Sequence, residues 1–196
     1  MPNEASQSDI QDIVKRAQEG SLADFQELYN LFAKPIYNFI WRLVGSASDA
    51  EDLTQDTFLK VHKELKKLRE PAQFKFWLYR IARNEVYQKL RRSKKVTETS
   101  LESEDVNYFD FLEDDSPGLD PEAQVLSGEL HEVIHRALGA MPPKYRDVFV
   151  LAVFQKESYE NITKVVGRSL LSVKTDIYRA RLIVKEYLNN YLKRSL

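Results

Sequence analysis

The chain has 196 residues, of which 43% are hydrophobic and 30% charged, which excludes a disordered or low-complexity protein. It contains no cysteine, which excludes disulfides and thiolate metal sites. The sequence begins with polar and acidic residues, and no apolar run approaches the roughly 20 residues of a bilayer span. We therefore expect a soluble, cytoplasmic protein with no membrane insertion.

The charges are segregated along the chain, although the net charge is only −1. Residues 1–59 are mainly acidic, residues 60–95 hold thirteen Lys and Arg against three acids, residues 96–122 hold ten acids and no base, and residues 123–196 hold twelve bases against seven acids. Clusters of Lys and Arg attract phosphate, so two basic regions around an acidic segment predict two contacts with nucleic acid. The alternative interpretation is that these charges cover solvated helix faces.

Helical periodicity predicts the elements of the first half of the chain. Ser21 caps a predicted helix in which apolar residues recur every three or four positions until Gly45 ends it. Ser48 and Glu51 form a predicted capping box for the next helix. After the break at Pro71, a third long helix is predicted from about residue 74 until it ends in the basic residues 91–95.

Periodicity disappears from Val96 to about Asp120, where acids, Ser and Asn dominate, so this segment is interpreted as a linker. Asp120 and Pro121 then begin a predicted helix that runs to about residue 140. Two prolines, at positions 142 and 143, begin another that reaches about residue 155.

The last part of the chain predicts a helix-turn-helix. A short helix covers residues 158–166, Gly167 and Arg168 form a turn, and Ser169 caps a longer basic helix that continues to the C-terminus. The predicted fold class is therefore all-α, with two small helical domains, residues 1–96 and 121–196, joined by a flexible acidic linker at residues 97–120.

A zinc-hydrolase pattern, H-E-x-x-H, occurs at His131, Glu132 and His135. A catalytic zinc needs a third protein ligand, and the remaining histidine, His62, lies in the other predicted domain. Glu157 and Glu160 are the acids that would have to serve instead. The two histidines of the pattern flank an apolar stripe, where amphipathic helices place polar residues, so we expect no metal, no cofactor and no enzyme.

Two sets of motifs resemble the extracytoplasmic-function group of bacterial RNA polymerase sigma factors. The first set is DAEDLTQDTFLKVHKEL, residues 49–65, followed by FKFWLYRIARNEVYQKLRR, residues 74–92. The second is ALGAMPPKYRDVFVLAVFQKESYENITKVVG, residues 137–167, with the helix that follows it. The resemblance implies a first domain that binds core polymerase and melts the downstream (−10) promoter element, and a second that binds the upstream (−35) element.

The resemblance also implies roles for individual residues of the first domain. The segment that docks on core polymerase corresponds to Glu51, Asp52, Gln55, Asp56 and Phe58, in which acids surround an apolar anchor. Contact with the melted downstream element corresponds to aromatic and amide side chains, with arginines near the backbone: Phe74, Trp77, Tyr79 and Asn84, and Arg80, Arg83, Arg91 and Arg92. A place in the core is an equal alternative for Phe74 and the favoured alternative for Trp77.

In the second domain the resemblance places the recognition helix at SLLSVKTDIYRARLIV, residues 169–184. Val173, Ile177 and Leu182 form its predicted inner face. The side chains left to approach upstream DNA are Lys174, Thr175, Tyr178, Arg179 and Arg181.

Four residues depart from the family's pattern: Gln88, Thr163, Leu171 and Asp176. An aspartate near DNA would repel phosphate or accept from a cytosine amino group, so Asp176 and Leu171 leave the upstream promoter sequence open. The acidic linker has two interpretations, a mimic of RNA in the polymerase or a tether.

The hypothesis is thus a non-enzymatic sigma factor that binds core RNA polymerase and promoter DNA, both duplex and melted, with an anti-sigma factor as a further partner. The alternatives are a helix-turn-helix regulator that acts without polymerase, and the zinc hydrolase. Target promoters, the inducing signal, the identity of the anti-sigma factor and the host are not determined by the sequence.

Overall fold

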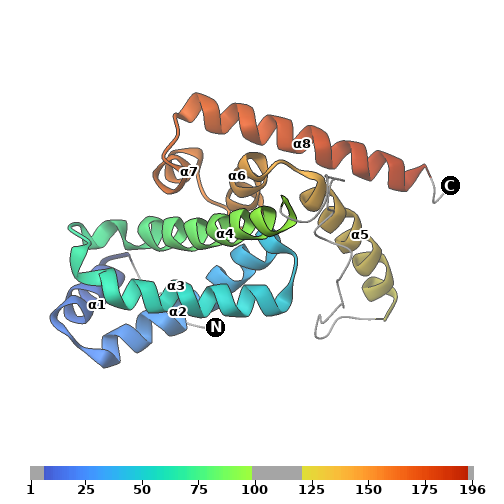
Figure 1. Cartoon of the computed structure of the whole chain (residues 1–196). Helices are drawn as coiled ribbons and strands as arrows, with labels where there is room; N and C mark the ends of the chain where they lie inside the picture. Colours follow the sequence, from blue (N-terminus) through green and yellow to red (C-terminus); the bar gives the residue numbers. More distant parts are fainter. Residues whose placement is uncertain (1–6, 99–120, 194–196) are drawn as a thin grey trace.

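The computed structural model describes residues 7–98 and 121–193, and within these residues all regular secondary structure is helical, which confirms the all-α prediction. The segment predicted as the linker lies outside the described residues, apart from positions 97 and 98. The helices are α1 (Gln7–Glu19), α2 (Leu22–Val44), α3 (Ala47–Glu64), α4 (Phe74–Glu98), α5 (Pro121–Ala140), α6 (Pro143–Val153), α7 (Tyr159–Val166) and α8 (Leu170–Leu192). Figure 1 shows their order in space.

Most helix ends lie where the sequence predicts them. The Ser21 hydroxyl accepts a hydrogen bond from the backbone N–H of Asp24, and Gly45, with φ of 79°, ends α2 in the left-handed conformation that glycine adopts without strain. The predicted capping box is wrong, because Ser46 rather than Ser48 caps α3. Directly after Gly45 the backbone of Ser46 is extended, as a cap requires, whereas Ser48 already lies in the first turn.

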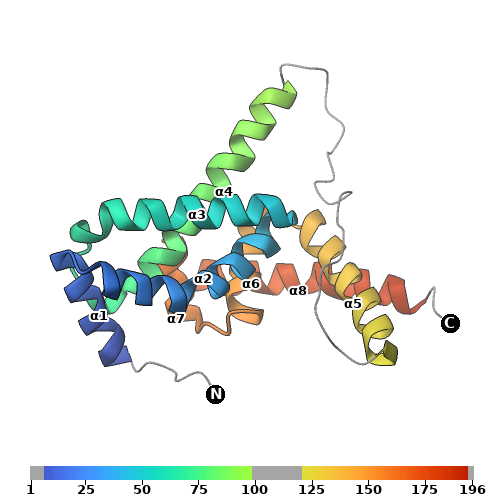
Figure 2. The ribbon, with the colours of Figure 1, turned by 90° about the horizontal axis from the view of Figure 1, so that it is seen from below.

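Two other differences concern helices in polar sequence. The N-terminal α1 was not predicted, and α4 continues to Glu98 instead of ending in the basic residues 91–95. Lys and Arg are good helix formers, so a basic run does not by itself end a helix. The C-terminal end of α4 projects away from the other helices (Figure 2).

The N-terminal half, α1 to α4, encloses a core of large aromatic and aliphatic side chains. Phe39 and Phe74 are fully buried, and the rings of Phe32 and Phe74 meet edge to face at a centroid distance of 5.4 Å. Two 3-10 turns, η1 (Leu65–Lys67) and η2 (Pro71–Gln73), connect α3 to α4. These contacts fix the position of α4 within this half.

The two halves also pack against each other, with α4 against α7, and α2 against α5 and α6. The rings of Trp41 and His135 meet edge to face at 4.4 Å, and the guanidinium of Arg42 lies 4.4 Å from the ring centre of Phe154. His135, predicted at the edge of an apolar stripe, is therefore buried between the halves. The N–H groups of Arg146 donate to the backbone oxygens of Leu43, Gly139 and Met141, so one buried side chain joins α2 to the turn between α5 and α6.

Desolvation lowers the pKa of Arg146 to about 10, which leaves the guanidinium charged at neutral pH. None of the described helices has an apolar stretch of the length and hydropathy that a membrane span requires.

Candidate nucleic-acid interface

The helix-turn-helix is formed by α7 and α8. The hydroxyl groups of Ser158 and Ser169 accept hydrogen bonds from the backbone N–H groups of Asn161 and Ser172, and so cap the two helices. Gly167, with φ of 68°, makes the turn between them in the left-handed region. These local signals fix the direction in which α8 leaves α7, and a recognition helix placed in this way enters the major groove.

The outer face of α8 brings all five predicted upstream-contacting side chains into solvent. They are Lys174, Thr175, Tyr178, Arg179 and Arg181. The Arg179 guanidinium donates to the Tyr145 hydroxyl at 2.9 Å, and this bond lowers the pKa of the tyrosine. Val173 and Ile177 are buried as predicted, but Leu182 is wrongly assigned to the inner face, because it is 48% exposed. Ala180 is the buried residue in the next turn.

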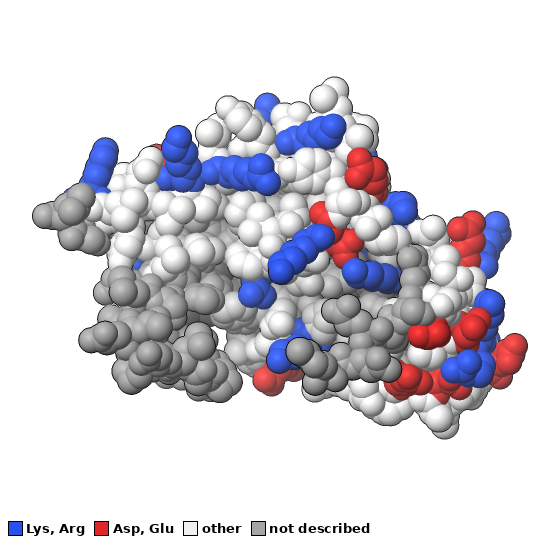
Figure 3. Space-filling model, turned by 180° about the vertical axis from the view of Figure 1, so that it is seen from behind, with Lys and Arg blue, Asp and Glu red and all other residues white. Residues whose placement is uncertain are grey.

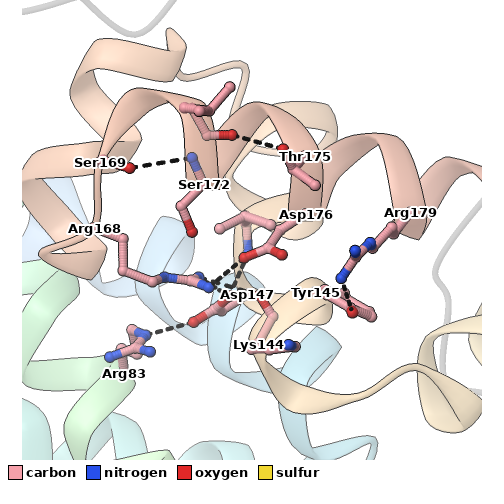
Figure 4. Close-up of polar contacts among 12 residues, drawn as sticks. Arg83, Lys144, Tyr145, Asp147, Arg168, Ser169, Ser172, Thr175, Asp176 and Arg179 are labelled. Carbon is pink, nitrogen blue, oxygen red and sulfur yellow. Dashed lines mark hydrogen bonds and ion pairs between the residues drawn. The ribbon is translucent and has the colours of Figure 1, made fainter.

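Asp176, whose effect on the upstream contact the sequence left open, does not lie on the exposed outer face of α8. Its carboxylate is buried beneath α8 and accepts from the guanidinium of Arg168, in the turn before the helix (Figure 4). The arginine compensates the negative charge of Asp176 within the chain. The sequence could not reveal this partnership, because Arg168 and Asp176 are on either side of the helix start and pair only once α8 is packed.

The predicted downstream-contacting residues of α4 divide into exposed and covered side chains. Arg80, Asn84, Arg91 and Arg92 are exposed, and the first three share one face because they are four and seven positions apart. Trp77 is partly buried and packs on the core, its favoured alternative.

Phe74 and Tyr79 are both buried. Phe74 therefore follows its core alternative, and the expectation that Tyr79 faces an unpaired base is wrong for this arrangement. Phe74 belongs to the core of the N-terminal half, and Tyr79 packs on Phe39 and donates from its hydroxyl to Gln155 at 2.8 Å. Desolvation and the nearby Glu157 carboxylate raise the pKa of the Tyr79 hydroxyl, which keeps it protonated. The C-terminal half thus covers one predicted DNA-contacting aromatic.

Arg83 is the other predicted DNA contact that the C-terminal half engages. Its Nε donates to the fully buried carboxylate of Asp147 on α6 at 2.6 Å, and the Tyr87 hydroxyl donates to the same oxygen at 3.1 Å. Arg168 donates to the other oxygen at 3.2 Å. Burial raises the pKa of the Asp147 carboxyl, while Arg83 and Arg168 oppose that shift. The ion pairs therefore run without a break from α4 through Asp147 and Arg168 to Asp176 on α8 (Figure 4).

The predicted polymerase-docking surface lies on α3. Glu51, Asp52, Gln55 and Asp56 are exposed, but Phe58 is only 4% exposed and its ring meets that of Tyr29 at 4.8 Å inside the N-terminal half. Phe58 is therefore a core residue and not a surface anchor. The sequence analysis missed Leu59, which is 58% exposed and lies three, four and seven positions after Asp56, Gln55 and Asp52. That spacing was the signal that could have identified it.

The H-E-x-x-H segment makes ordinary side-chain contacts. Glu132 accepts from Arg136 at 3.0 Å, one helical turn away, and the ring of His135 packs on Trp41. The side chain of His131 lies outside the described residues. Among the residues that the structure describes, no three His, Cys, Asp or Glu side chains are grouped as metal ligands.

The charge distribution on the surface follows the helices. Basic side chains line the upper part of the view in Figure 3, where α8 runs, and acids gather mostly at the lower corner over the N-terminal helices. A basic surface is therefore exposed on the C-terminal half, apart from the acids over the N-terminal helices.

Comparisons with known proteins agree with this arrangement. Family models described as "Sigma-70 region 2" and "Sigma-70, region 4" match residues 28–96 and 131–183. The RNA polymerase sigma-H factor of Pseudomonas aeruginosa is 29% identical over 189 residues, which cover 96% of this chain and 98% of the relative. In Bacillus subtilis, the ECF RNA polymerase sigma factor SigW is 27% identical over 90% of this chain and 95% of its own length, and the RNA polymerase sigma factor YlaC is 30% identical over 82% and 90%.

Among solved structures, that of the sigma factor RpoE from Bartonella quintana, in complex with the anti-sigma factor NepR, has a similar fold. The TM-score is 0.67 at 24% identity, and the match covers 86% of this chain and 98% of that one. The match extends over both halves of the chain, so the likeness is to the whole fold and not to one helical domain.

Proposed function

The chain belongs to the extracytoplasmic-function group of RNA polymerase sigma factors, which bind core polymerase and direct promoter-specific transcription initiation, and from this premise we propose which residues make which contact. Residues 1–96 bind polymerase and the downstream element, and residues 121–196 bind the upstream element. The protein acts in the cytoplasm as a regulator without catalytic activity of its own.

The outer face of α8 carries the proposal for upstream recognition. Five polar or basic side chains, the predicted upstream set, are exposed on one helix whose start is fixed by the Ser169 cap and the Gly167 turn. Lys174, Arg179 and Arg181 supply the positive charge that attracts phosphate, and Thr175 and Tyr178 lie between them to approach the base edges.

The downstream element is bound by the exposed face of α4. Asn84 bonds an unpaired base, while Arg80, Arg91 and Arg92 contact the backbone. Trp77 and Phe74 support this face from the core. Arg83 and Tyr79 join the contact with DNA only when the C-terminal half no longer covers them.

The surface of α3 binds core polymerase. Glu51, Asp52, Gln55 and Asp56 provide charge and hydrogen-bonding groups, and Leu59 provides the exposed apolar centre in place of Phe58. Interfaces of this kind place an apolar anchor among polar groups that exclude water. An anti-sigma factor is the further partner that we propose, because the structural relative RpoE is bound to one.

The decisive experiment is reconstitution with core polymerase and run-off transcription from promoters selected out of a random library. We expect the chain to bind core polymerase and to initiate at a defined position downstream of a two-part promoter. A folded chain that does not bind core polymerase would overturn the proposal.

The alternative, a regulator that acts without polymerase, predicts tight binding of the free protein to a palindromic site. We expect weak binding of the free protein and strong binding of the holoenzyme to the same promoter. Gel-shift titrations of both on one DNA fragment separate the two functions, provided that the salt concentration is held fixed.

A further inference from the structure

The outermost line of side chains on α8 is largely apolar. Leu171 is 75% exposed and Tyr178 is 63% exposed. Thr175 lies between them on the same line, since residues four and seven positions apart share one face of a helix. The buried residues Val173 and Ile177 lie on the opposite face. Packing within the chain therefore gives no reason for leucine and tyrosine at these positions.

Two polar side chains near this line, Thr175 and Arg179, form hydrogen bonds within the chain. The Thr175 hydroxyl donates to the backbone oxygen of Leu171 at 2.9 Å, so its proton is used within the helix, and the methyl group is the apolar group that this side chain offers to an outside contact. Arg179 donates to the Tyr145 hydroxyl, which holds the guanidinium to one side of the line. The groups presented by the first two turns of α8 are therefore carbon atoms flanked by charge.

We propose that Leu171, Thr175 and Tyr178 read the methyl groups of thymines in the upstream promoter element, an inference that rests on the proposed role of α8 as recognition helix. Thymine is the base that presents an apolar group, its C5 methyl, in the major groove. The N-terminal residues of a recognition helix reach the base edges, and Leu171 lies in the first turn of α8. The departure from the family's pattern at position 171 thus determines specificity.

The test removes single methyl groups from the DNA. A promoter is selected with reconstituted holoenzyme, and each thymine of its upstream element is replaced in turn by deoxyuridine, which lacks only the C5 methyl. We expect one or two replacements to weaken holoenzyme binding about fourfold, which corresponds to ~0.8 kcal/mol per buried methyl-sized group. In a holoenzyme with Leu171→Ala, deoxyuridine at the thymine that Leu171 contacts should no longer weaken binding.

Leu192→Ala is the matched control, because Leu192 is also an exposed leucine on α8 but lies about 31 Å farther along a helix that rises about 1.5 Å per residue. This variant should keep the full sensitivity to deoxyuridine. Three results would overturn the inference in a holoenzyme that still transcribes. In the first, no deoxyuridine replacement weakens binding, and in the second, the selected upstream element contains no thymine. In the third, the Leu171→Ala holoenzyme loses as much binding on each replacement as the unmodified one. A holoenzyme that initiates nowhere overturns the proposed function itself.

A separate observation, the buried Asp147 carboxylate, carries a second inference. Asp147 accepts from Arg83 and Tyr87 of α4 on one oxygen and from Arg168 of its own half on the other. A fully buried carboxylate is stable when such charged donors surround it, and loss of one partner leaves the remaining charges uncompensated. The contact between the halves therefore depends on these particular charged side chains in these positions.

We infer that Asp147 holds the two halves in a closed state that does not engage the downstream promoter element. Its carboxylate takes the place at Arg83 that a DNA phosphate oxygen would otherwise occupy, so closing and promoter contact exclude each other. In the same state Gln155 covers the Tyr79 hydroxyl. When the halves separate, the ion pair between Asp147 and Arg168 remains, while Arg83 and Tyr79 both become accessible to DNA.

The test locks the halves at a contact outside the proposed DNA and polymerase surfaces. Lys75 of α4 and Glu157 before α7 form an ion pair across the halves. The chain has no cysteine, so Lys75→Cys combined with Glu157→Cys provides a unique pair for a reducible bis-maleimide crosslinker. We expect the crosslinked protein to lose at least tenfold in promoter-specific run-off transcription and to recover when the crosslinker is cleaved.

Either single-cysteine variant, treated in the same way, is the control and should transcribe at the rate of the untreated protein. Asp147→Asn in the double-cysteine chain should slow crosslinking severalfold, because the halves then spend less time closed. If Asp147→Asn does not fold, Arg83→Gln tests the same contact from the other half. Full transcription by the crosslinked protein, or an unchanged crosslinking rate in the folded variants, would overturn the inference.

Discussion

The two surfaces that are proposed to bind promoter DNA differ in what covers them. On α8, all five predicted side chains are exposed, and the acid that lies between them in the sequence, Asp176, is turned inward to Arg168. On α4, four of the eight predicted side chains are exposed, Trp77 is half-buried, Phe74 and Tyr79 are buried, and Arg83 is engaged by Asp147. The upstream surface is therefore ready for DNA in this state, whereas the downstream surface is only partly accessible.

This difference has a physical origin in the neighbours of each helix. The inner face of α8 packs within its own half, so its outer face remains free. By contrast, α4 lies between the N-terminal core and α7, so two of its faces are used for packing. A helix between two layers has a narrower free face than a helix at the edge of the molecule.

The largest effect that we expect separates core residues from DNA-contacting residues on α4. Phe74→Ala should lower the free energy of unfolding by about 3 to 5 kcal/mol, because it removes a fully buried ring and leaves a cavity. Urea unfolding followed by circular dichroism measures this change. The exposed Leu59→Ala is the control and should change stability by about 0.5 kcal/mol or less. If Phe74→Ala leaves the protein stable and impairs only promoter melting, Phe74 would instead be assigned as a DNA contact.

On the open surface, Arg179→Ala should reduce promoter-specific initiation about tenfold or more. A well-placed arginine contributes about 1 to 3 kcal/mol to recognition, and Arg179 is exposed on the outer face of α8. Run-off transcription with a fixed amount of holoenzyme measures the loss, and binding to core polymerase should be unchanged. Lys193→Ala, at the far end of the helix, serves as the matched removal of a positive charge. Equal losses of initiation in Arg179→Ala and Lys193→Ala would mean that the overall positive charge of α8 attracts the DNA and that the position of Arg179 does not matter.

On the partly covered surface, Asn84→Ala should slow promoter melting about fivefold, the loss of one hydrogen bond of ~1 kcal/mol. Fluorescence of a base analogue placed in the downstream element reports melting, and fluorescence anisotropy reports binding to core polymerase. Gln88→Ala, one turn along the same exposed side of α4, should leave melting unchanged. Equal defects in melting and in polymerase binding for Asn84→Ala would contradict the assignment.

The smallest effect is expected away from both surfaces, at the H-E-x-x-H segment. Glu132→Gln breaks an exposed pair with Arg136 and should cost at most about 0.5 kcal/mol in stability, with no change in transcription. Metal analysis of the purified chain accompanies this measurement. Stoichiometric zinc, or a peptidase activity that Glu132→Gln removes, would instead support the hydrolase.

Much of the fold was accessible from the sequence because its signals are local. Ser21 and Ser169 cap the helices that they were predicted to cap, Ser158 caps the helix that was predicted to begin with it, and Gly45 and Gly167 end helices in the left-handed conformation. Each signal acts over three or four residues, so it does not depend on the rest of the chain. The exception at Ser46 shows the limit, since two serines that are two positions apart, Ser46 and Ser48, compete for one cap.

The candidate sites were predictable only in part. The family resemblance pointed to the outer face of α8 and to the acidic face of α3, and the polar side chains of both faces are exposed. It placed Phe58 and Tyr79 at contact surfaces, although both are buried, and their burial depends on residues elsewhere in the fold. The spacing of residues along a helix tells which side chains share a face, but it does not tell what covers that face.

The sequence by itself determined an all-helical chain in two parts, the helix-turn-helix, and the sigma-factor family, because helix caps, periodicity and motifs are written in neighbouring residues. The tertiary structure alone decided that Arg83 and Asp147, 64 positions apart, form one buried ion pair, and that Asp176 faces inward. Burial of a charge requires a partner of opposite charge, and such a partner is brought near only when the two halves pack. The accessibility of the downstream DNA surface is thus a property of the folded arrangement and not of any segment.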